Sequence, residues 1–328
     1  MPEHIRREPK VLVSTENLTE QEWLAYRRRG IGGSDVAAIF GISPFRTARD
    51  LYDDKLNIAS AADDAGNWVA LEMGHLLEPL VARIFAKKTG LEVFQIKKMF
   101  QHPQYPFMLA DVDYFVRLPN GKIAILEIKT TNYNAKDHWW KDGEECVPVY
   151  YETQGRHYMT VMDIDEIFYC CLYGNNEDEV IIRHLYRDRE YEQEMIYLER
   201  EFWHDHILTR IPPPYTEDGS LILESLRRRL GAADKTIPAI QLDSDLSAVM
   251  LRYLSLQEQR QQVETQVKTL DTEMQRLKGQ MVAKLNGSCM AMGEYGGTQY
   301  TISYNPVSRT GITKDNLQKL KLLHPGYL

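Results

Sequence analysis

The chain has 328 residues, of which 43% are hydrophobic and 26% charged, a composition typical of a globular protein with one large domain or two ordinary ones. It has no stretch of about 18 apolar residues and no apolar segment typical of a secretory signal, so we expect no membrane span and a cytoplasmic location. The net charge of −8 argues against broad charge neutralisation of nucleic acid, although contact in a local channel or cleft is compatible with it.

Helical patterns come first along the chain. Residues 19–29, TEQEWLAYRRR, open with a capping-box pattern and predict a helix that ends in three arginines. A GIGG loop follows, and Ser34 is predicted to be the N-cap of a short helix. Helices are also predicted over 46–56 and 67–89. Pro79 in the latter predicts a kink or a new helix start, because proline lacks an N–H.

The apolar period then changes to that of strands. Elements are predicted at 91–100, 107–117 and 122–130 (strands), 148–162 (helix), 165–173 and 179–187 (strands) and 190–209 (helix). This order predicts a mixed α/β domain over 1–210, in which an antiparallel meander leads into a helical crossover.

The sequence pattern changes near residue 211. The segment IPPPYTEDGS begins a predicted linker over 211–243. In 244–285 the apolar residues follow an alternating 3,4 spacing, which predicts one helix roughly 60 Å long. This helix is either an arm that packs on its own domain or a coiled coil between subunits. Residues 286–328 are predicted to form a small β-containing tail.

Two predicted strands carry a pattern that suits metal-dependent hydrolysis. Asp113 lies on one strand, and Glu127 and Lys129 lie on the next. Carboxylates hold Mg²⁺, or Mn²⁺ in its place, and the carbonyl of Ile128 is a candidate third ligand. Residues i and i+2 of a strand share a face, so Lys129 emerges beside Glu127, where its ammonium can orient an attacking water.

The acid-x-Lys pattern alone is weak, because it occurs three times, at Glu8, Asp53 and Glu127. Its plainest interpretation is an exposed strand face with alternating charges. Only the third occurrence lies in an apolar strand, IAILEIKT, and follows a strand that carries an acid. Unpaired charges would be costly there, whereas charges that share a metal ion would not.

Four further motifs accompany this pattern in a fixed order. They are RRRGIGGSD (Arg27 to Asp35), GHLLEP (Gly74 to Pro79), LADVD (Leu109 to Asp113) and YETQ (Tyr151 to Gln154). With them, roughly residues 20–205 resemble the YqaJ-like viral recombinases, relatives of phage lambda exonuclease in the PD-(D/E)XK nuclease superfamily. The resemblance implies a restriction-endonuclease-like core, with a central mixed sheet flanked by helices.

The resemblance also implies roles for individual residues. Asp113 and Glu127 match metal-binding carboxylates, and Lys129 matches the catalytic lysine. Glu78 matches a helix-borne acid that completes the metal site, and Gln154 matches a glutamine placed beside it. Taken alone, Glu78 would more often be a surface residue and Gln154 a structural hydrogen bonder.

A second set of matches concerns the DNA end. Arg28 and Ser34 match residues that grip the terminal 5′-phosphate in the lambda relative, and Arg29 is the alternative because the loop here is one residue shorter. Each also has a plain interpretation, since Ser34 suits a helix cap and the arginines suit a helix C-terminus. Asp111 replaces a phosphate-binding serine, so we expect it to face a metal or stay solvated.

The implied function is a Mg²⁺-dependent exonuclease that digests linear double-stranded DNA from its 5′ ends and leaves 3′ single strands for recombination. The family implies a homo-oligomeric ring, a trimer, around DNA, a single-strand annealing protein as partner and, for a phage protein, the host cytoplasm. Two alternatives stay open. One is an endonuclease of the same superfamily, and the other is a DNA-end-binding scaffold with a vestigial nuclease core.

Overall fold

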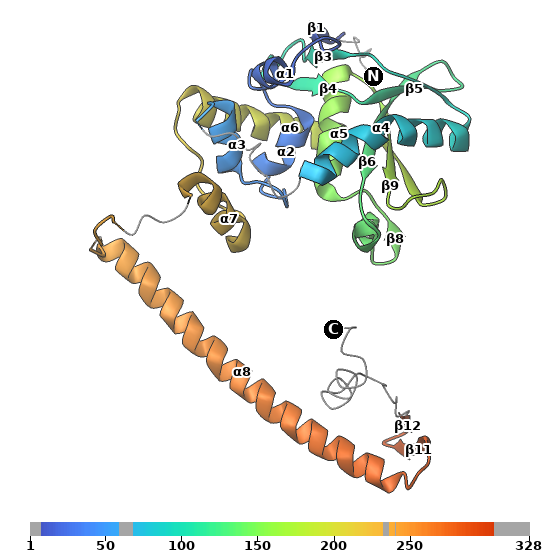
Figure 1. Ribbon diagram of the computed structural model, residues 1–328, viewed down its shortest axis with the longest axis vertical. Coiled ribbons are helices and arrows are strands. Elements are labelled where there is room, and N and C mark those ends of the chain that lie inside the picture. The colour runs from blue at the N-terminus through green and yellow to red at the C-terminus, as the bar shows by residue number, and fades with distance from the viewer. Residues whose placement is uncertain (1–7, 59–67, 232–235, 240, 305–328) are drawn as a thin grey trace, which may run out of the picture. The chain divides into compact units, whose positions relative to one another are not determined.

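The chain divides into two compact units, Met1–Asp234 and Lys235–Leu328. The computed structural model describes residues 8–58, 68–231, 236–239 and 241–304 (Figure 1). In these described residues, no helix combines the length and apolar character needed to cross a membrane.

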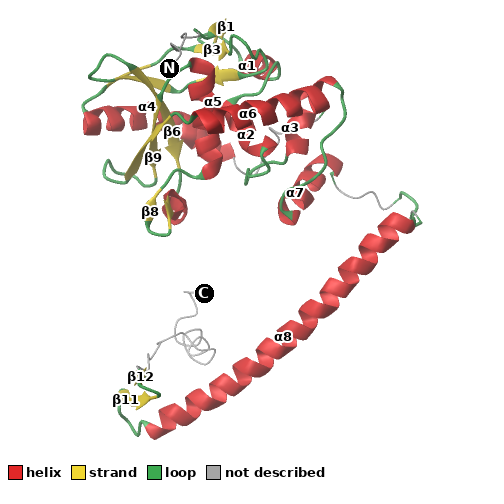
Figure 2. Cartoon of the chain, turned by 180° about the vertical axis from the view of Figure 1, so that it is seen from behind, coloured by secondary structure: helices red, strands yellow, loops and turns green. Residues whose placement is uncertain are grey.

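A five-stranded mixed sheet forms the centre of the first unit, with its strands in the order β10-β9-β6-β5-β2. The bounds are Glu92–Phe94 (β2), Tyr114–Arg117 (β5), Ile123–Thr130 (β6), Glu166–Leu172 (β9) and Val180–Tyr186 (β10). Strands β6 and β9 run parallel and the other pairs run antiparallel. Figure 2 shows this twisted sheet with helices around it. The predicted mixed α/β core, with its meander and helical crossover, is therefore confirmed.

Helices cover both faces of the sheet, which explains the apolar character of β6. Helix α4 (Trp68–Thr89) packs on one face, where Leu126 and Ile128 point, and α5 (Val149–Met162) packs on the other, where Ile125 points (Figure 1). Because alternate residues of a strand face opposite sides, Glu127 and Lys129 lie on the α5 side.

Two strands were predicted longer than they are, because the chain leaves one sheet for another. Predicted strand 91–100 is interrupted at residues 95–97, and predicted strand 107–117 is interrupted at residues 112–113. The detached pieces join a three-stranded sheet in the order β1-β3-β4. Its strands are Lys10–Ser14 (β1), Lys98–Gln101 (β3) and Leu109–Asp111 (β4). This switch between sheets leaves Asp113 at the junction.

Three short helices precede α4, namely Glu20–Arg27 (α1), Gly33–Ile39 (α2) and Ala48–Lys55 (α3). The predicted capping box of α1 is present, with Glu22 accepting the Thr19 N–H at 2.9 Å. The N-cap of α2 is Gly32 rather than Ser34, because the side chain of Asp35 accepts the Gly32 N–H at 2.9 Å and starts the helix earlier. The new helix start predicted at Pro79 is absent, since α4 is a single helix.

The first unit extends further than the predicted limit at residue 210. Helix α7 (Gly219–Leu230) lies within the segment predicted to be a linker. Its Ser225 hydroxyl donates to Asp50 of α3 at 2.6 Å, and Arg228 forms an ion pair with the same carboxylate at 3.0 Å. These long-range contacts hold α7 in the first unit.

The remaining elements of the first unit are Tyr133–Trp139 (η1, a 3₁₀ helix), Trp140–Lys141 (β7), Glu144–Glu145 (β8), Arg189–Glu201 (α6) and Phe202–Leu208 (η2, a π-helix). The predicted helix 190–209 thus changes from α to π geometry in its last part.

Helix α6 is tied to α5 and β4 by a fully buried pair of titratable residues. His157 Nδ1 lies 2.8 Å from Glu199 Oε1, and His157 Nε2 lies 2.8 Å from the Leu109 carbonyl oxygen. Burial lowers the pKa of His157, but the charge of Glu199 and both hydrogen bonds outweigh it, so the pKa is raised. The pair therefore keeps a proton that the unfolded chain releases near pH 6.5.

This pair predicts a loss of stability in alkaline solution. Because the folded pKa of His157 is raised, its contribution is complete below about pH 6.5 and disappears as the pH rises through the folded value. Melting temperatures measured between pH 6 and 9 should fall less steeply for His157→Gln than for the wild type. Equal slopes for the wild type and His157→Gln would contradict this prediction.

The second unit contains the predicted long helix as one element, α8 (Ser244–Lys284), whose residues are not buried. Two antiparallel strands follow, Met290–Tyr295 (β11) and Thr298–Ser303 (β12). The predicted tail is thus a hairpin up to residue 304, and its part from 305 to 328 lies outside the described residues.

Candidate active site

The first site residue, Asp113, lies where strand β5 stops pairing with β6. The ladder between these strands reaches Tyr114 and Leu126. One residue before Tyr114, the Asp113 Oδ2 atom accepts the Ile128 N–H at 2.9 Å. Beyond the end of the ladder, the Ile128 N–H of β6 donates to the Asp113 side chain instead of to the backbone of β5. This hydrogen bond fixes the carboxylate beside Glu127 and Lys129.

Glu127, Lys129 and Gln154 form one hydrogen-bonded group. The Lys129 ammonium donates to Glu127 Oε1 at 2.7 Å and to Gln154 Oε1 at 3.0 Å. The Gln154 amide donates to the same Glu127 oxygen at 2.5 Å and to the Tyr158 hydroxyl at 3.4 Å. Lys129 Nζ also lies 4.6 Å from the centroid of the Tyr151 ring. The structure therefore brings together three residues that the sequence predicted separately.

A glycine allows α5 to approach the sheet this closely. A Cβ atom on Gly155 would lie 1.9 Å from the Tyr169 hydroxyl oxygen on β9, a distance at which atoms overlap. That hydroxyl donates instead to the Tyr151 carbonyl of α5 at 3.0 Å. The absent side chain therefore sets the separation at which Gln154 reaches Glu127.

The acids of this region are held in unfavourable surroundings. Burial, followed by the charge of Glu127, raises the pKa of Asp113 to about 8. Burial, followed by the charge of Asp113, raises the pKa of Glu78 to about 7, and burial also raises the pKa of Glu127. Burial lowers the pKa of Lys129, but the charges of Glu127 and Asp113 outweigh this effect. The pKa is therefore raised and the amine is charged. The Lys129 ammonium thus lowers the pKa of all three acids, but burial outweighs it in each. A further cation would stabilise their ionised forms.

One buried oxygen marks the place where such a cation fits. Glu127 is 1% exposed, and its Oε2 atom has no hydrogen-bond partner in the described part of the chain. Carboxylate oxygens are the donors that hard divalent ions prefer. Among the described residues, however, no three acidic, histidine or cysteine side chains form a ready-made metal site. An ion here would therefore need other oxygen ligands in addition to these carboxylates.

A cavity of about 630 Å³ opens beside this group. Its wall contains four acids, Glu16, Glu78, Asp111 and Asp113, together with Arg27, Lys97 and Ser34. The buried Glu127 is connected to it through Gln154 and Tyr158, because the Tyr158 ring lines the same cavity. Negative and positive groups thus face one open cavity, as the binding of a metal ion and a phosphate would require.

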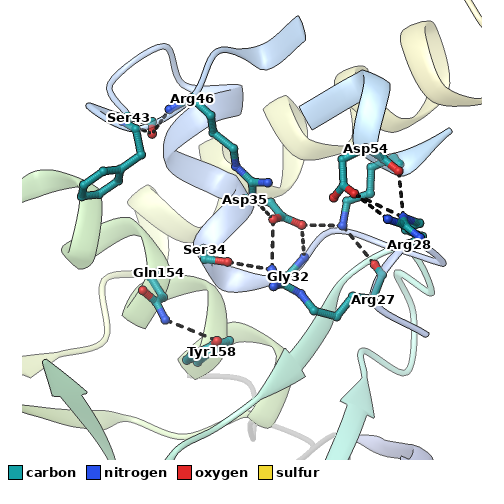
Figure 3. Close-up of polar contacts among 12 residues, drawn as sticks. Arg27, Arg28, Gly32, Ser34, Asp35, Ser43, Arg46, Asp54, Gln154 and Tyr158 are labelled. Carbon is teal, nitrogen blue, oxygen red and sulfur yellow. Dashed lines mark hydrogen bonds and ion pairs between the residues drawn. The ribbon is translucent and has the colours of Figure 1, made fainter. Parts of the chain in front are cut away.

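Arg27 is the arginine that reaches the cavity, and sequence reasoning missed it. Its Nη2 atom donates to the Ser34 hydroxyl at 2.7 Å and to Asp35 Oδ1 at 3.2 Å (Figure 3). Arg28 is instead paired with Asp54 at 3.1 Å, and Arg29 lies over the Tyr26 ring. Neither Arg28 nor Arg29 lines the cavity. Successive residues at a helix end point in different directions, so only the phase of α1 distinguishes the three arginines.

Trp23 is the second residue that sequence reasoning missed. Its indole N–H donates to Asp111 Oδ2 at 2.7 Å, and the Arg27 guanidinium lies 4.8 Å from its ring centroid. Asp111 thus faces the cavity but is held by a neutral donor. The apolar pattern of α1 gave no sign of this contact, because Trp23 and Asp111 are 88 residues apart.

A family model and a curated relative both match this chain, and they point to the same family. Residues 22–165 match the YqaJ-like viral recombinase domain. Protein YqaJ of Bacillus subtilis (strain 168) is 32% identical over 268 residues, which cover 81% of this chain and 80% of the relative.

Solved structures are more distant. An alkaline exonuclease from Laribacter hongkongensis is 19% identical with a TM-score of 0.47 and covers 58% of this chain and 93% of its own. Its complex with dAMP gives a TM-score of 0.48, 19% identity and coverage of 64% and 97%. A phage-related exonuclease from Haemophilus somnus 129PT is 13% identical with a TM-score of 0.40 and coverage of 58% and 100%.

Proposed function

The chain belongs to the YqaJ-like viral recombinase family, and on this premise we propose that it is a Mg²⁺-dependent exonuclease that degrades linear double-stranded DNA. The observation that carries the proposal is the buried Glu127 carboxylate, which contacts Lys129 on one oxygen, has no hydrogen-bond partner among the described residues on the other, and is close enough to Asp113 for its charge to raise the pKa of that acid. A vestigial scaffold would have no need for this arrangement.

We propose the following roles for the residues of the site. Asp113, Glu127 and Glu78, with the Ile128 carbonyl, would hold the cation, which would polarise the phosphodiester and supply hydroxide near neutral pH. Mg²⁺ commonly keeps several waters and binds substrate phosphate, so a site with an incomplete set of protein ligands suits it.

Lys129 and Gln154 have different roles in this proposal. The Lys129 ammonium orients the attacking water and offsets the charge that develops on the phosphate. Gln154 contacts both Lys129 and Glu127 and so fixes their relative positions. Gln154 is thus a positioning residue in this scheme.

We propose that two other residues of the cavity recognise the DNA end. Arg27 and Ser34 hydrogen-bond to each other and line the space that Asp113 also faces. An arginine guanidinium has five N–H donors, so Arg27 can bind a terminal 5′-phosphate in addition to Ser34. We therefore propose 5′-to-3′ digestion that leaves 3′ single strands for recombination in the bacterial cytoplasm.

Digestion of matched DNA substrates tests this function. The protein should degrade end-labelled linear duplex in Mg²⁺ or Mn²⁺ and release label from the 5′ end first. Covalently closed circular DNA should stay intact, and EDTA should stop all cleavage. Cutting of the circle would favour the endonuclease alternative. Binding of ends with no cleavage under any metal would favour the scaffold.

The second unit is proposed to serve assembly rather than chemistry. The family resemblance suggests a ring, a trimer, of subunits around DNA and a single-strand annealing protein as partner, and α8 offers a long apolar stripe for either contact. Deletion of residues 244–328 should change the number of subunits, given by the light-scattering mass divided by the subunit mass, or remove partner binding, with less than about a tenfold change in cleavage rate. A deletion that abolishes cleavage but leaves the number of subunits unchanged would contradict this assignment.

A further inference from the structure

A buried charge cluster lies directly behind Arg27. Its centre is Asp35 of α2, which is 1% exposed and accepts four groups (Figure 3). Lys55 Nζ approaches Oδ2 at 2.6 Å and the Gly32 N–H approaches it at 2.9 Å. Arg46 and Arg27 both contact Oδ1. Three cations therefore surround a single anion, and the cluster carries a net charge of about +2.

The three cations do not share Asp35 equally. Arg46 makes the closest contact to Oδ1 and Lys55 makes the closest contact to Oδ2, whereas Arg27 lies at 3.2 Å. Burial would raise the pKa of Asp35, but Lys55, Arg46 and Arg27 together hold it well below its usual range, so the carboxylate is ionised. Its charge is matched mainly by the two nearer cations, because ion-pair attraction weakens with distance.

Only one of the three cations reaches the cavity. Arg27 lines it, while Arg46 and Lys55 do not. Lys55 also donates to the Arg27 backbone carbonyl at 2.9 Å and so anchors the end of α1. The positive charge that Asp35 leaves unmatched is therefore presented to the cavity through Arg27.

We propose that Arg46 is a positioning residue for recognition of the DNA end: by occupying Asp35 Oδ1, it leaves the Arg27 guanidinium available to a terminal phosphate. Without Arg46, that oxygen has Arg27 as its remaining cation, so Arg27 turns toward Asp35 and the cluster loses one positive charge. This inference rests on the proposed function, in which the cavity receives a 5′-phosphorylated end.

The test compares duplexes that differ only in their 5′ group. KM and kcat are measured for linear DNA with 5′-phosphate or 5′-hydroxyl ends, using wild type, Arg46→Met, Arg46→Lys and Arg117→Met. Arg117 forms an exposed ion pair with Glu92 on the edge of the sheet and is the matched control. Equilibrium binding of both duplexes in EDTA is measured in parallel by fluorescence anisotropy.

Arg46→Met should raise KM for phosphorylated ends about tenfold, the usual scale for a hydrogen bond to a charged group. Its kcat should change less than about twofold, and KM for hydroxyl ends should stay at the wild-type value. Arg46→Lys should restore most of the preference because it keeps the charge, and Arg117→Met should match the wild type. If Arg46→Met is unfolded at the assay temperature, Arg46→Gln tests the same loss of charge and should give the same result.

Three outcomes would overturn the inference. They are an equal rise in KM for both end types, an unchanged preference in Arg46→Met, and a wild type with no preference for phosphorylated ends. Failure of the proposed function is a separate result, because a wild type that cuts no DNA still reports its end preference in the binding measurement without metal.

Discussion

Replacement of Lys129 by methionine should abolish cleavage and leave the binding of DNA ends intact. The Lys129 ammonium lies 2.7 Å from Glu127 Oε1, whereas Arg27 and Ser34 hydrogen-bond to each other and line the cavity, which Lys129 does not line. Loss of one preorganised charge-stabilising donor commonly lowers kcat by a factor of 10²–10³, so we expect a decrease on the order of 10³-fold. Single-turnover cleavage of end-labelled duplex measures this effect, and anisotropy measures binding.

Lys122 provides the matched control for this prediction. It lies one residue before β6, is exposed and pairs with Asp165. Lys122→Met should cleave DNA at the wild-type rate. Mg²⁺-dependent cleavage by Lys129→Met within about tenfold of the wild type would reject the proposed role of the lysine.

Replacement of Asp113 by asparagine should remove both metal binding and turnover. Asparagine keeps the shape of the side chain and an oxygen that can accept the Ile128 N–H, but it loses the charge that a divalent ion needs. We expect calorimetric Mn²⁺ affinity to fall on the order of 100-fold, the upper end of the losses seen even for residues that support a metal ligand. Cleavage should fall with it.

Asp165→Asn is the corresponding control, because Asp165 is an exposed aspartate one residue before β9. This variant should bind Mn²⁺ and cleave DNA like the wild type. Unchanged Mn²⁺ binding in Asp113→Asn, with the fold intact by circular dichroism, would remove Asp113 from the metal site.

Local patterns were sufficient to predict most of the first unit. The switch from helical to strand periodicity located the sheet, and the apolar residues around Glu127 correctly indicated a strand buried on both faces. The predicted meander placed Asp113 close to Glu127, and in the structure Asp113 lies one residue before β5, which pairs with β6, so their proximity followed from the sequence. Lys129 was predicted beside Glu127 for a similar reason, because residues two apart on a strand lie on the same face.

Features that depend on distant contacts were not predictable in the same way. The breaks after Phe94 and Asp111 depend on the chain changing sheets, which no local period indicates. Helix α7 was missed because its first turn follows a proline-rich segment, and its place is fixed by Asp50, 175 residues from Ser225. The choice among the three arginines depends on where Ser34 lies in space.

The contact between Gly155 and Tyr169 has a consequence for genetics. A screen for loss of digestion would be expected to recover substitutions at position 155, although this residue reaches neither the cation nor the nucleic acid. Even alanine would force α5 away from the sheet. The amide of the preceding residue, Gln154, would then lose its hydrogen bond to Glu127. Such mutants would resemble active-site mutants in their phenotype while every active-site side chain is still encoded.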